Sequence, residues 1–277
     1  MKDLIKKIAP PFLLDWVKSA LTKPHSFSPV WNTVDYDPIR GLKLFFDPNG
    51  SWQKSYLDGT YDRFFFDRLE KLDLRRKVVY DIGAHIGFHS FYFARMVGPE
   101  GKVYAFEPHP KNIERMSLIL HQNKNIAPIV SLVNVAISDK NGVEQFRLSD
   151  DIESGRSSGG FIESADTIWD KQAYDDRGFV KTKVRTFTLD SIKELGVDRA
   201  PDIIKIDVEG AEALVLKGAR KTITKHRPLI LLEIHSIINM FNVLSFLASV
   251  SYETEMLKKE KDGRCFIEAR SKKQEGQ

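Results

Sequence analysis

The chain has 277 residues, 42% of them hydrophobic and 29% charged, with a formal net charge of +4. These values are typical of a soluble globular protein with one main core, and they exclude a uniformly basic surface that attracts nucleic acid. The single cysteine, Cys265, excludes an internal disulfide and fits a reducing compartment, so we expect a cytoplasmic protein. The sequence contains no apolar run as long as the ~18–20 residues of a membrane helix.

Residues 1–20 are basic and amphipathic. Their apolar side chains are interspersed with lysines, and the prolines Pro10 and Pro11 interrupt the pattern. The segment predicts a helix that packs on its own domain or on a partner. The alternative is a helix that lies on an anionic membrane, which would make the protein membrane-peripheral.

Three further segments complete an N-terminal extension over residues 1–72. Ser26–Pro38 has the composition of an irregular linker. The β-prone runs Leu42–Phe46 and Trp52–Leu57 flank an Asn-Gly pair, which predicts a β-hairpin. Tyr61–Leu72 has apolar residues at helical spacing and predicts a helix.

Short apolar runs alternate with helical patterns in the main domain, residues 73–277. The expected strands are Lys77–Asp81, Lys102–Phe106, Ile129–Ile137, Ile203–Ile206 and Leu229–Ile234, and the expected helices are Ile86–Val97, Pro110–Asn123 and Ala211–Gly218. This alternation predicts a doubly wound, mostly parallel sheet with helices on both faces, a Rossmann-like α/β fold. A polar insertion, Asp150–Lys181, interrupts the rhythm and predicts either a substrate-side loop or disorder.

The first candidate motif, Asp81–Gly87, follows the first strand of this sheet. Ligands bind at the carboxyl ends of parallel strands, and Gly83 and Gly87 let the backbone turn sharply there. With Ala84 and His85 between them, they open a helix whose free N–H groups suit a carboxylate. Asp81 would accept from an ammonium group, so the motif favours an amino-acid ligand over a pyrophosphate. A tight structural turn is the alternative.

Glu107-Pro108 ends the second strand, about twenty residues after the glycines. A carboxylate at this position accepts hydrogen bonds from both hydroxyls of a ribose. The motif therefore predicts a nucleoside, although it does not name the reaction.

Ala136-Ile137-Ser138-Asp139 ends the third expected strand. Backbone groups near Ala136, or the side chains of Ser138 and Asp139, would border the base of that nucleoside. A structural turn explains the same residues equally well.

A cluster of charged residues lies at the carboxyl ends of two expected strands. Lys205, Asp207 and Glu209 lie at the end of Ile203–Ile206, and Glu233 and His235 lie at the end of Leu229–Ile234. Charge at the catalytic end of a sheet is costly unless it is paired or used. His235 is the first candidate for a general base and the three acids are the alternatives, while Lys205 would balance their charge or orient a substrate. The carboxylates could hold a divalent metal, but the sequence predicts no definite ligand set.

Taken together, these motifs resemble the FkbM family of methyltransferases from about Val78 to His235. The most specific parts are Asp81–Gly87, Phe106–Pro108, Thr188-Leu189-Asp190, Ile204–Glu212, and Arg227-Pro228 followed by Glu233–His235. One departure is His85, where family members often have asparagine.

The resemblance implies a class I methyltransferase fold, with a seven-stranded sheet whose last strand is antiparallel. Ser251–Met256 and Arg264–Ala269 would supply the final two strands. It also implies that S-adenosylmethionine is the methyl donor and that the acceptor is a hydroxyl, often on a sugar, a glycan or another small metabolite. It assigns Asp81, Glu107 and Asp207, with the two glycines, to the cofactor site.

Three other functions are alternatives to this one. The motifs are also compatible with a non-catalytic nucleoside- or glycan-binding domain, although such a domain has little need of the charged cluster. A nicotinamide-dependent oxidoreductase is disfavoured because Asp81 occupies the first glycine position of its motif. An RNA methyltransferase is disfavoured by the lack of a basic-aromatic pattern.

Overall fold

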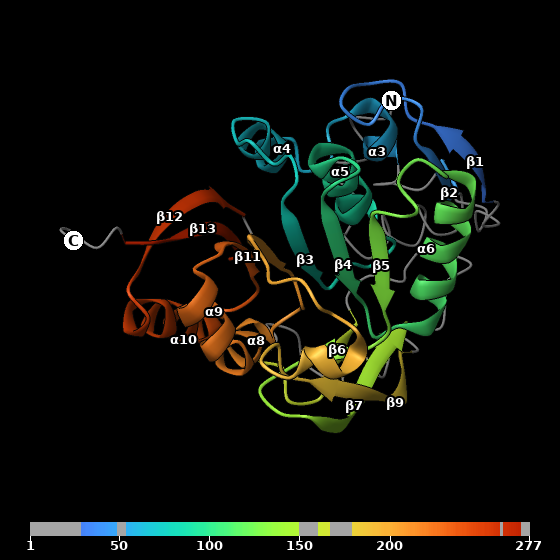
Figure 1. Cartoon of the computed structure of the whole chain (residues 1–277). Helices are drawn as coiled ribbons and strands as arrows, with labels where there is room; N and C mark the ends of the chain where they lie inside the picture. The colour runs from blue at the N-terminus through green and yellow to red at the C-terminus, as the bar shows by residue number, and fades with distance from the viewer. Residues whose placement is uncertain (1–28, 49–53, 150–159, 167–178, 261–262, 273–277) are drawn as a thin grey trace, which may run out of the picture.

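Seven strands form the central sheet of the protein, which a computed structural model describes at residues 29–48, 54–149, 160–166, 179–260 and 263–272 (Figure 1). The order across the sheet is β12 (Tyr252–Lys259), β13 (Cys265–Ser271), β11 (Leu229–Ile234), β10 (Ile203–Ile206), β3 (Val78–Ile82), β4 (Lys102–Phe106) and β5 (Val130–Val133). All pairings are parallel except those of β13, which runs antiparallel to both of its neighbours. The expected class I methyltransferase fold, with its antiparallel last strand, is therefore confirmed.

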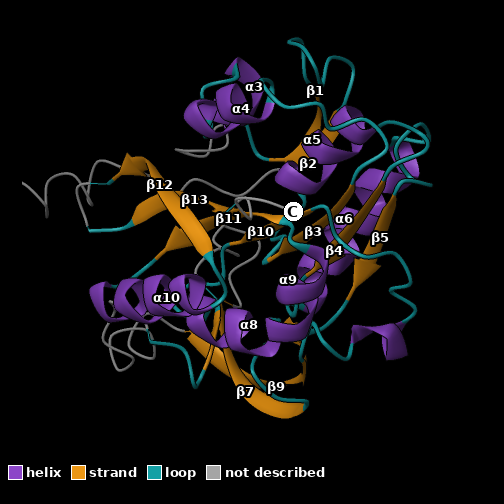
Figure 2. Ribbon diagram, turned by 60° about the vertical axis from the view of Figure 1, so that its left-hand side comes forward, coloured by secondary structure: helices purple, strands orange, loops and turns teal. Residues whose placement is uncertain are grey.

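Helices cover both faces of this sheet (Figure 2). One face packs against α3 (Lys54–Asp58), α4 (Arg63–Leu69), α5 (Phe88–Val97) and α6 (Pro110–Gln122). The other packs against the 3-10 helix η1 (Ile192–Leu195) and against α8 (Glu212–Gly218), α9 (Arg220–His226) and α10 (Ile237–Ser249). Because the central strands are buried on both faces, their sequences are predominantly apolar, and this is why their bounds were predictable.

A second, smaller sheet lies against the carboxyl ends of the main strands. Its order is β6 (Ala136–Ile137), β9 (Phe179–Phe187), β7 (Gly142–Ser149) and β8 (Phe161–Ile162). The single strand expected over Ile129–Ile137 is wrong, because the chain leaves the main sheet after Val133 and β6 pairs with β9 instead. Part of the predicted insertion also belongs to this sheet, whereas residues 150–159 and 167–178 lie outside the described residues.

The N-terminal extension differs from the sequence prediction in two places. Lys43–Phe46 forms β2, but its hairpin partner is β1 (Val30–Thr33), which lies within the expected linker. Lys54–Asp58 is the helix α3, so the strand expected over Trp52–Leu57 is wrong. The buried Tyr56 ring of α3 lies 4.4 Å from the Phe88 ring, which gives this segment a tertiary reason to be helical.

Two other N-terminal predictions have different outcomes. The helix expected over Tyr61–Leu72 is present as the shorter α4. The predicted amphipathic helix at residues 1–20 lies outside the described residues. None of the helices in the described part of the chain combines the length and the apolar character that crossing a bilayer requires.

The order of the strands reverses between β3 and β10. From β3 the chain proceeds outward to β4 and β5, and it then returns to place β10 and β11 on the other side. The connections that follow β3 and β10 therefore run in opposite directions and leave a crevice at the carboxyl ends of these two strands. Both β3 and β10 carry one charged residue in register, because Lys205 pairs with Asp81 across the parallel ladder.

Gly83 closes the contact between these two strand ends. A Cβ atom on Gly83 would lie 1.8 Å from the carbonyl oxygen of Asp207, and its φ of +78° also favours glycine. The glycine is thus required by backbone packing within the protein. Gly87 is required for a similar reason, since a Cβ there would lie 2.6 Å from the Phe91 ring.

We predict that Gly83→Ala destabilises the protein more than Gly196→Ala does. Gly196 has nearly the same φ, +77°, but a Cβ atom there would meet nothing within 4 Å. The control should lose about 1–2 kcal/mol of unfolding free energy through the left-handed backbone alone. Gly83→Ala should lose a further ~1–3 kcal/mol through overpacking. Urea unfolding of both variants measures the difference, and equal losses would contradict the proposed contact.

Candidate functional site

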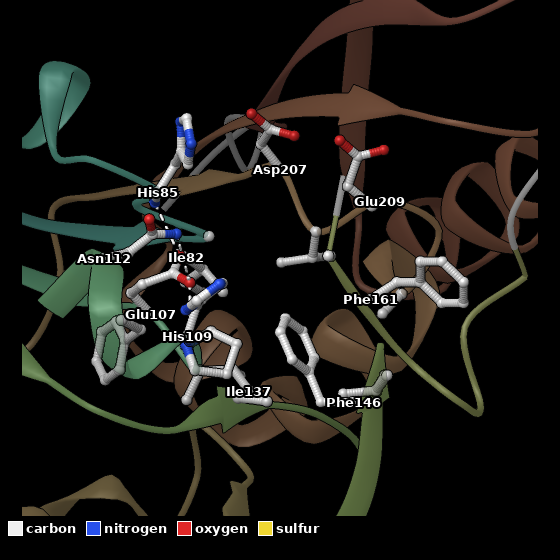
Figure 3. Close-up of a pocket in the computed structure, with 18 of the residues that line it drawn as sticks. Ile82, His85, Glu107, His109, Asn112, Ile137, Phe146, Phe161, Asp207 and Glu209 are labelled. Carbon is white, nitrogen blue, oxygen red and sulfur yellow. Dashed lines mark hydrogen bonds between the residues drawn. The ribbon is translucent and has the colours of Figure 1, made fainter. Parts of the chain in front are cut away.

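A cavity of about 430 Å³ opens at the carboxyl ends of β3, β4, β10 and β11. The second sheet forms its opposite wall through β6, Phe146 of β7 and Phe161 of β8. Figure 3 shows Glu107 with His85 and Asn112 on one side of this cavity, and Asp207 and Glu209 on another. The fold therefore brings the predicted nucleoside motif and the predicted charged cluster to a single site.

Glu107 is held rigidly by the backbone around it. Its Oε2 accepts from the N–H of His85 at 2.8 Å, and its Oε1 accepts from the N–H of His109 at 2.9 Å. The turn at Gly83 is tied to the same strand end, because the N–H groups of Gly83 and Ala84 both donate to the carbonyl of Phe106 at 3.0 Å. The first two predicted motifs thus form one hydrogen-bonded unit.

Burial raises the pKa of Glu107 to about 7, although the N–H groups of His109 and His85 and the side chain of Asn112 oppose this shift. Asn112 donates to Glu107 Oε1 at 3.3 Å, while its own Oδ1 is buried and has no hydrogen-bond partner among the described residues. A buried acceptor without a donor is costly. This wall of the cavity therefore offers acceptors to a ligand that carries hydroxyl or amino groups.

Asp81 and Lys205 lie behind the cavity rather than in it. Asp81 is fully buried; its Oδ2 accepts from the Ser90 hydroxyl at 2.5 Å and its Oδ1 lies 3.3 Å from Lys205 Nζ. Lys205 Nζ also donates to Asp207 Oδ2 at 3.3 Å and to the carbonyl of Gly83 at 3.2 Å. Although burial alone would lower the pKa of Lys205, the Asp81 and Asp207 carboxylates raise it, so the ammonium group stays charged.

Three acids and one histidine form what we call the acid cluster: Asp207, Glu209, Glu233 and His235. The His235 side chain is 3% exposed, and its Nε2 lies 3.7 Å from Asp207 Oδ1, 3.5 Å from Glu209 Oε2 and 3.6 Å from Glu233 Oε1. All four residues line the cavity. The sequence prediction that these strand ends converge is therefore borne out in the geometry, whereas their chemical roles remain predictions.

Residues around the acid cluster fix its orientation. His235 Nδ1 lies 2.8 Å from Oε1 of the buried Glu212, and Asn239 donates to the other oxygen of Glu212. Arg264 Nη1 donates to Glu233 Oε1 at 2.6 Å. Since Glu212 is an acceptor, the proton of neutral His235 sits on Nδ1, and Nε2 faces the cavity with its lone pair.

The acid cluster shifts the titration of its own members. Burial raises the pKa of Glu233 to about 8, with a further contribution from Asp207. Burial also raises the pKa of Glu209. Burial opposes the charged form of His235, but the neighbouring carboxylates, Glu209 first, raise the pKa of this imidazole well above its usual value. Without a ligand, the cluster therefore retains protons near neutral pH.

Glu209 is placed by an unusual backbone conformation. Its φ is +52°, and the following Gly210 has a φ of +104°. A non-glycine residue in the left-handed region costs about 1–3 kcal/mol and is commonly found at functional sites. The turn directs the Glu209 carboxylate toward Nε2 of His235, from a chain segment that has already left β10.

The remaining predicted cofactor residues fall into two groups. Gly83, His85, Pro108 and Ala136 line the cavity. The other four, which lie outside its lining, are Ala84, Gly87, Ser138 and Asp139.

Contacts within the protein involve the backbone of one of these outer positions. The N–H of Ser138 donates to the carbonyl of Phe187 at 2.9 Å, and a Cβ on Gly218 would lie 2.0 Å from the Ser138 carbonyl. Asp139 is exposed to solvent. The Ser138 backbone is therefore packed within the protein, and the cofactor role predicted for Ser138 and Asp139 stays a prediction.

Several residues of the cavity wall were not singled out from the sequence. They are Tyr61, His109, Asn112, Phe146, Phe161, Ile162, Val208 and Arg264. Asn112 lies one turn into the helix after Glu107, so a search for polar residues at that spacing would have found it. Phe146, Phe161 and Arg264 carry no such local signal, because only tertiary structure brings them to the strand ends.

Comparison with known proteins identifies the same domain. Residues 81–257 match the methyltransferase FkbM domain. The hexuronic acid methyltransferase AglP of Haloferax volcanii is 27% identical over 214 residues, which cover 76% of this chain and 77% of that protein. The 2-O-methyltransferase NoeI of Sinorhizobium fredii is 30% identical over 164 residues, or 57% of this chain and 63% of that protein.

A solved structure shares the fold. The crystal structure of methyltransferase FkbM from Methylobacillus flagellatus aligns with a TM-score of 0.50 and 17% identity, over 78% of this chain and 53% of that chain. The match thus spans about half the length of that protein, and less than two thirds of NoeI. The domain match covers most of the sheet and all of the acid cluster. The chain therefore belongs to the FkbM methyltransferase family and is a methyltransferase with a class I fold.

Proposed function

We propose that this protein transfers a methyl group from S-adenosylmethionine to a hydroxyl oxygen on a sugar, a glycan or a similar small metabolite. One observation carries the proposal: Glu107 and the acid cluster line the same cavity. The first suits a nucleoside, and the second suits an acceptor that must lose a proton. The names of AglP and NoeI, a hexuronic acid methyltransferase and a 2-O-methyltransferase, support a sugar hydroxyl as the acceptor.

The cavity wall around Glu107 fits the donor. The two oxygens of Glu107 and the unpaired Oδ1 of Asn112 would accept from the ribose hydroxyls and neighbouring donors. Val135, Ala136 and Ile137 line the cavity with apolar side chains that would pack against the base. Asp207 borders the glycine turn and lines the cavity, so the amino-acid end of the donor would lie close to it. Asp81 then acts as a positioning residue through Lys205.

The chemistry requires little of the protein beyond alignment and one proton transfer. S-adenosylmethionine supplies a methyl group that the sulfonium has already activated. The acceptor oxygen forms its bond to carbon, the carbon–sulfur bond breaks, and the hydroxyl proton passes to the acid cluster. Phe146, Phe161 and Ile162 pack along the opposite wall, where they would exclude water and hold the apolar face of an acceptor.

We predict that Glu107→Gln weakens the binding of S-adenosylhomocysteine by about 10–100-fold, because it removes charge-assisted hydrogen bonds of ~1.5–3 kcal/mol. Glu114→Gln is the matched control, since Glu114 is an exposed glutamate on the same side of the sheet that does not line the cavity. Isothermal titration calorimetry measures both affinities. A wild-type protein that does not bind this ligand would refute the proposed donor.

The raised pKa of Glu107 predicts a pH dependence of that binding. Ribose hydroxyls donate to the ionised carboxylate, so binding favours the form that predominates above the pKa of about 7. Affinity should be roughly constant above pH 7.5 and should fall by up to tenfold per pH unit below 7. In Glu107→Gln this component should disappear. Calorimetry at pH 6 and pH 8 tests the prediction, and tighter binding at pH 6 would contradict it.

Product analysis with isotope-labelled donor tests the acceptor. Incubation with uronic-acid-containing oligosaccharides should yield a mono-O-methyl sugar, detectable by mass spectrometry. Glu209→Gln should lower turnover by about 10²–10⁴-fold if this carboxylate receives the proton, while its affinity for S-adenosylhomocysteine stays within a few-fold of wild type. Label found on nitrogen, or turnover unchanged in the variant, would rule out this assignment.

A further inference from the structure

The geometry points to a divalent metal site in the acid cluster: we propose that Asp207, Glu233 and His235 bind a first-row transition metal ion such as Mn²⁺. The sequence alone predicts no ligand set, because the three residues come from the ends of two different strands. In the fold, one ligand atom from each residue lies within 4.8 Å of the others. Mixed carboxylate and imidazole ligands are those that Mn²⁺, Fe²⁺ and Zn²⁺ accept.

The separations between these atoms are too long for hydrogen bonds and suitable for a shared ion. His235 Nε2 lies 3.7 Å from Asp207 Oδ1 and 3.6 Å from Glu233 Oε1. Two ligand atoms that are each ~2.1 Å from one ion, at an angle of about 110–120°, are separated by roughly 3.4–3.6 Å. A small closure of the side chains would therefore bring all three to bonding distance of a common point.

His235 supplies a second, independent observation. Its side chain is 3% exposed and lines the cavity, and its Nε2 faces three carboxylate oxygens at 3.5, 3.6 and 3.7 Å, in ion-pair range but longer than a usual hydrogen bond. Its other nitrogen is bound at 2.8 Å by Glu212, which is outside the proposed ligand set and is itself held by Asn239. A histidine that ligates a metal usually donates its other ring N–H to a carboxylate in this way. When the imidazole is neutral, its Nε2 lone pair is thus directed at the two acids, an arrangement that a shared cation would stabilise.

The charges around the site also favour a cation. Asp81, Asp207, Glu209, Glu212 and Glu233 contribute five carboxyl groups, whereas Lys205 and Arg264 are the permanently charged cations bonded to them. Lys205 contacts the Oδ2 of Asp207, which leaves Oδ1 to face His235. Arg264 contacts the Glu233 Oε1 that faces His235, and it would have to share that atom or shift to the second oxygen.

An ion at this position would have a defined role, which rests on the proposed O-methylation. Asp207, Glu233 and His235 line the cavity that Glu107 also borders, so a bound ion would be open to a hydroxyl of the acceptor. Coordination lowers the pKa of a hydroxyl, and Glu209, whose Oε2 lies 3.5 Å from Nε2, would be the adjacent base. The ion would thereby orient the acceptor and assist its deprotonation.

The test is a titration of the full chain with Mn²⁺, followed by the electron paramagnetic resonance signal of the free ion. We expect one saturable site per chain. Asp207→Asn and Glu233→Gln should each weaken it at least tenfold, and Glu212→Gln should weaken it 10–100-fold, as is typical for a carboxylate behind a ligand. Glu255→Gln, at an exposed acid on β12, is the matched control and should bind as wild type does.

Electron spin-echo spectroscopy of the wild-type complex adds a readout that does not depend on the folding of any variant. A nitrogen nucleus from His235 should modulate the echo, and His235→Asn should abolish that modulation. Absence of saturable binding, absence of nitrogen modulation, or equal binding in all the acid variants would overturn the site. If the wild-type protein binds S-adenosylhomocysteine but not Mn²⁺, only the metal site is refuted. If it binds Mn²⁺ but not S-adenosylhomocysteine, the proposed function is refuted.

Discussion

The buried ammonium group of Lys205 ties together the two strands between which the cavity opens. It forms an ion pair with Asp81 of β3 and donates hydrogen bonds to Asp207 beyond β10 and to the carbonyl of Gly83. Removing it would leave the fully buried Asp81 with the Ser90 hydroxyl but without its cation, and such a loss is strongly destabilising. Together with the β3–β10 pairing and the contact of Gly83 with Asp207, this side chain therefore fixes the position of the glycine turn relative to the acid cluster.

Local sequence patterns were sufficient for the inner strands β3, β4, β10 and β11 of the central sheet because these strands are buried on both faces. The bounds of β4, β10 and β11 agree with the expected ranges for this reason. The expected strand Ile129–Ile137 failed because its mostly apolar sequence resumes after Asn134, although the chain changes sheet there. Asn134 marks the break, and its amide donates to the carbonyl of Glu107, a contact that no periodicity reveals.

The candidate site was predictable to the extent that it lies at strand ends. Glu107 and the members of the acid cluster follow predicted strands directly, so parallel topology alone brings them together. The roles of Asp81 and Ser138 were harder to predict, since both were expected to contact the donor. Both residues are buried outside the cavity lining. The sequence alone does not distinguish a strand-end residue that faces a ligand from one that faces a neighbouring strand. Arg264 and Phe161 reach the cavity from segments remote in sequence, through contacts that only the folded chain defines.

The second sheet gives the cavity two walls of different origin. The side of the cavity proposed for the donor is built from β3, β4 and β6, and Ile82, Phe106 and Ile137 belong to the main core, whereas Phe146 and Phe161 belong to a separate small cluster of buried residues. The strands β7, β8 and β9 form no pairing with the seven-stranded sheet. Side chains on β7 and β8 can therefore change in size or polarity with little effect on the bonds around Glu107. Substitutions on β7 and β8 could therefore change which acceptor this fold binds while the binding of the methyl donor is preserved.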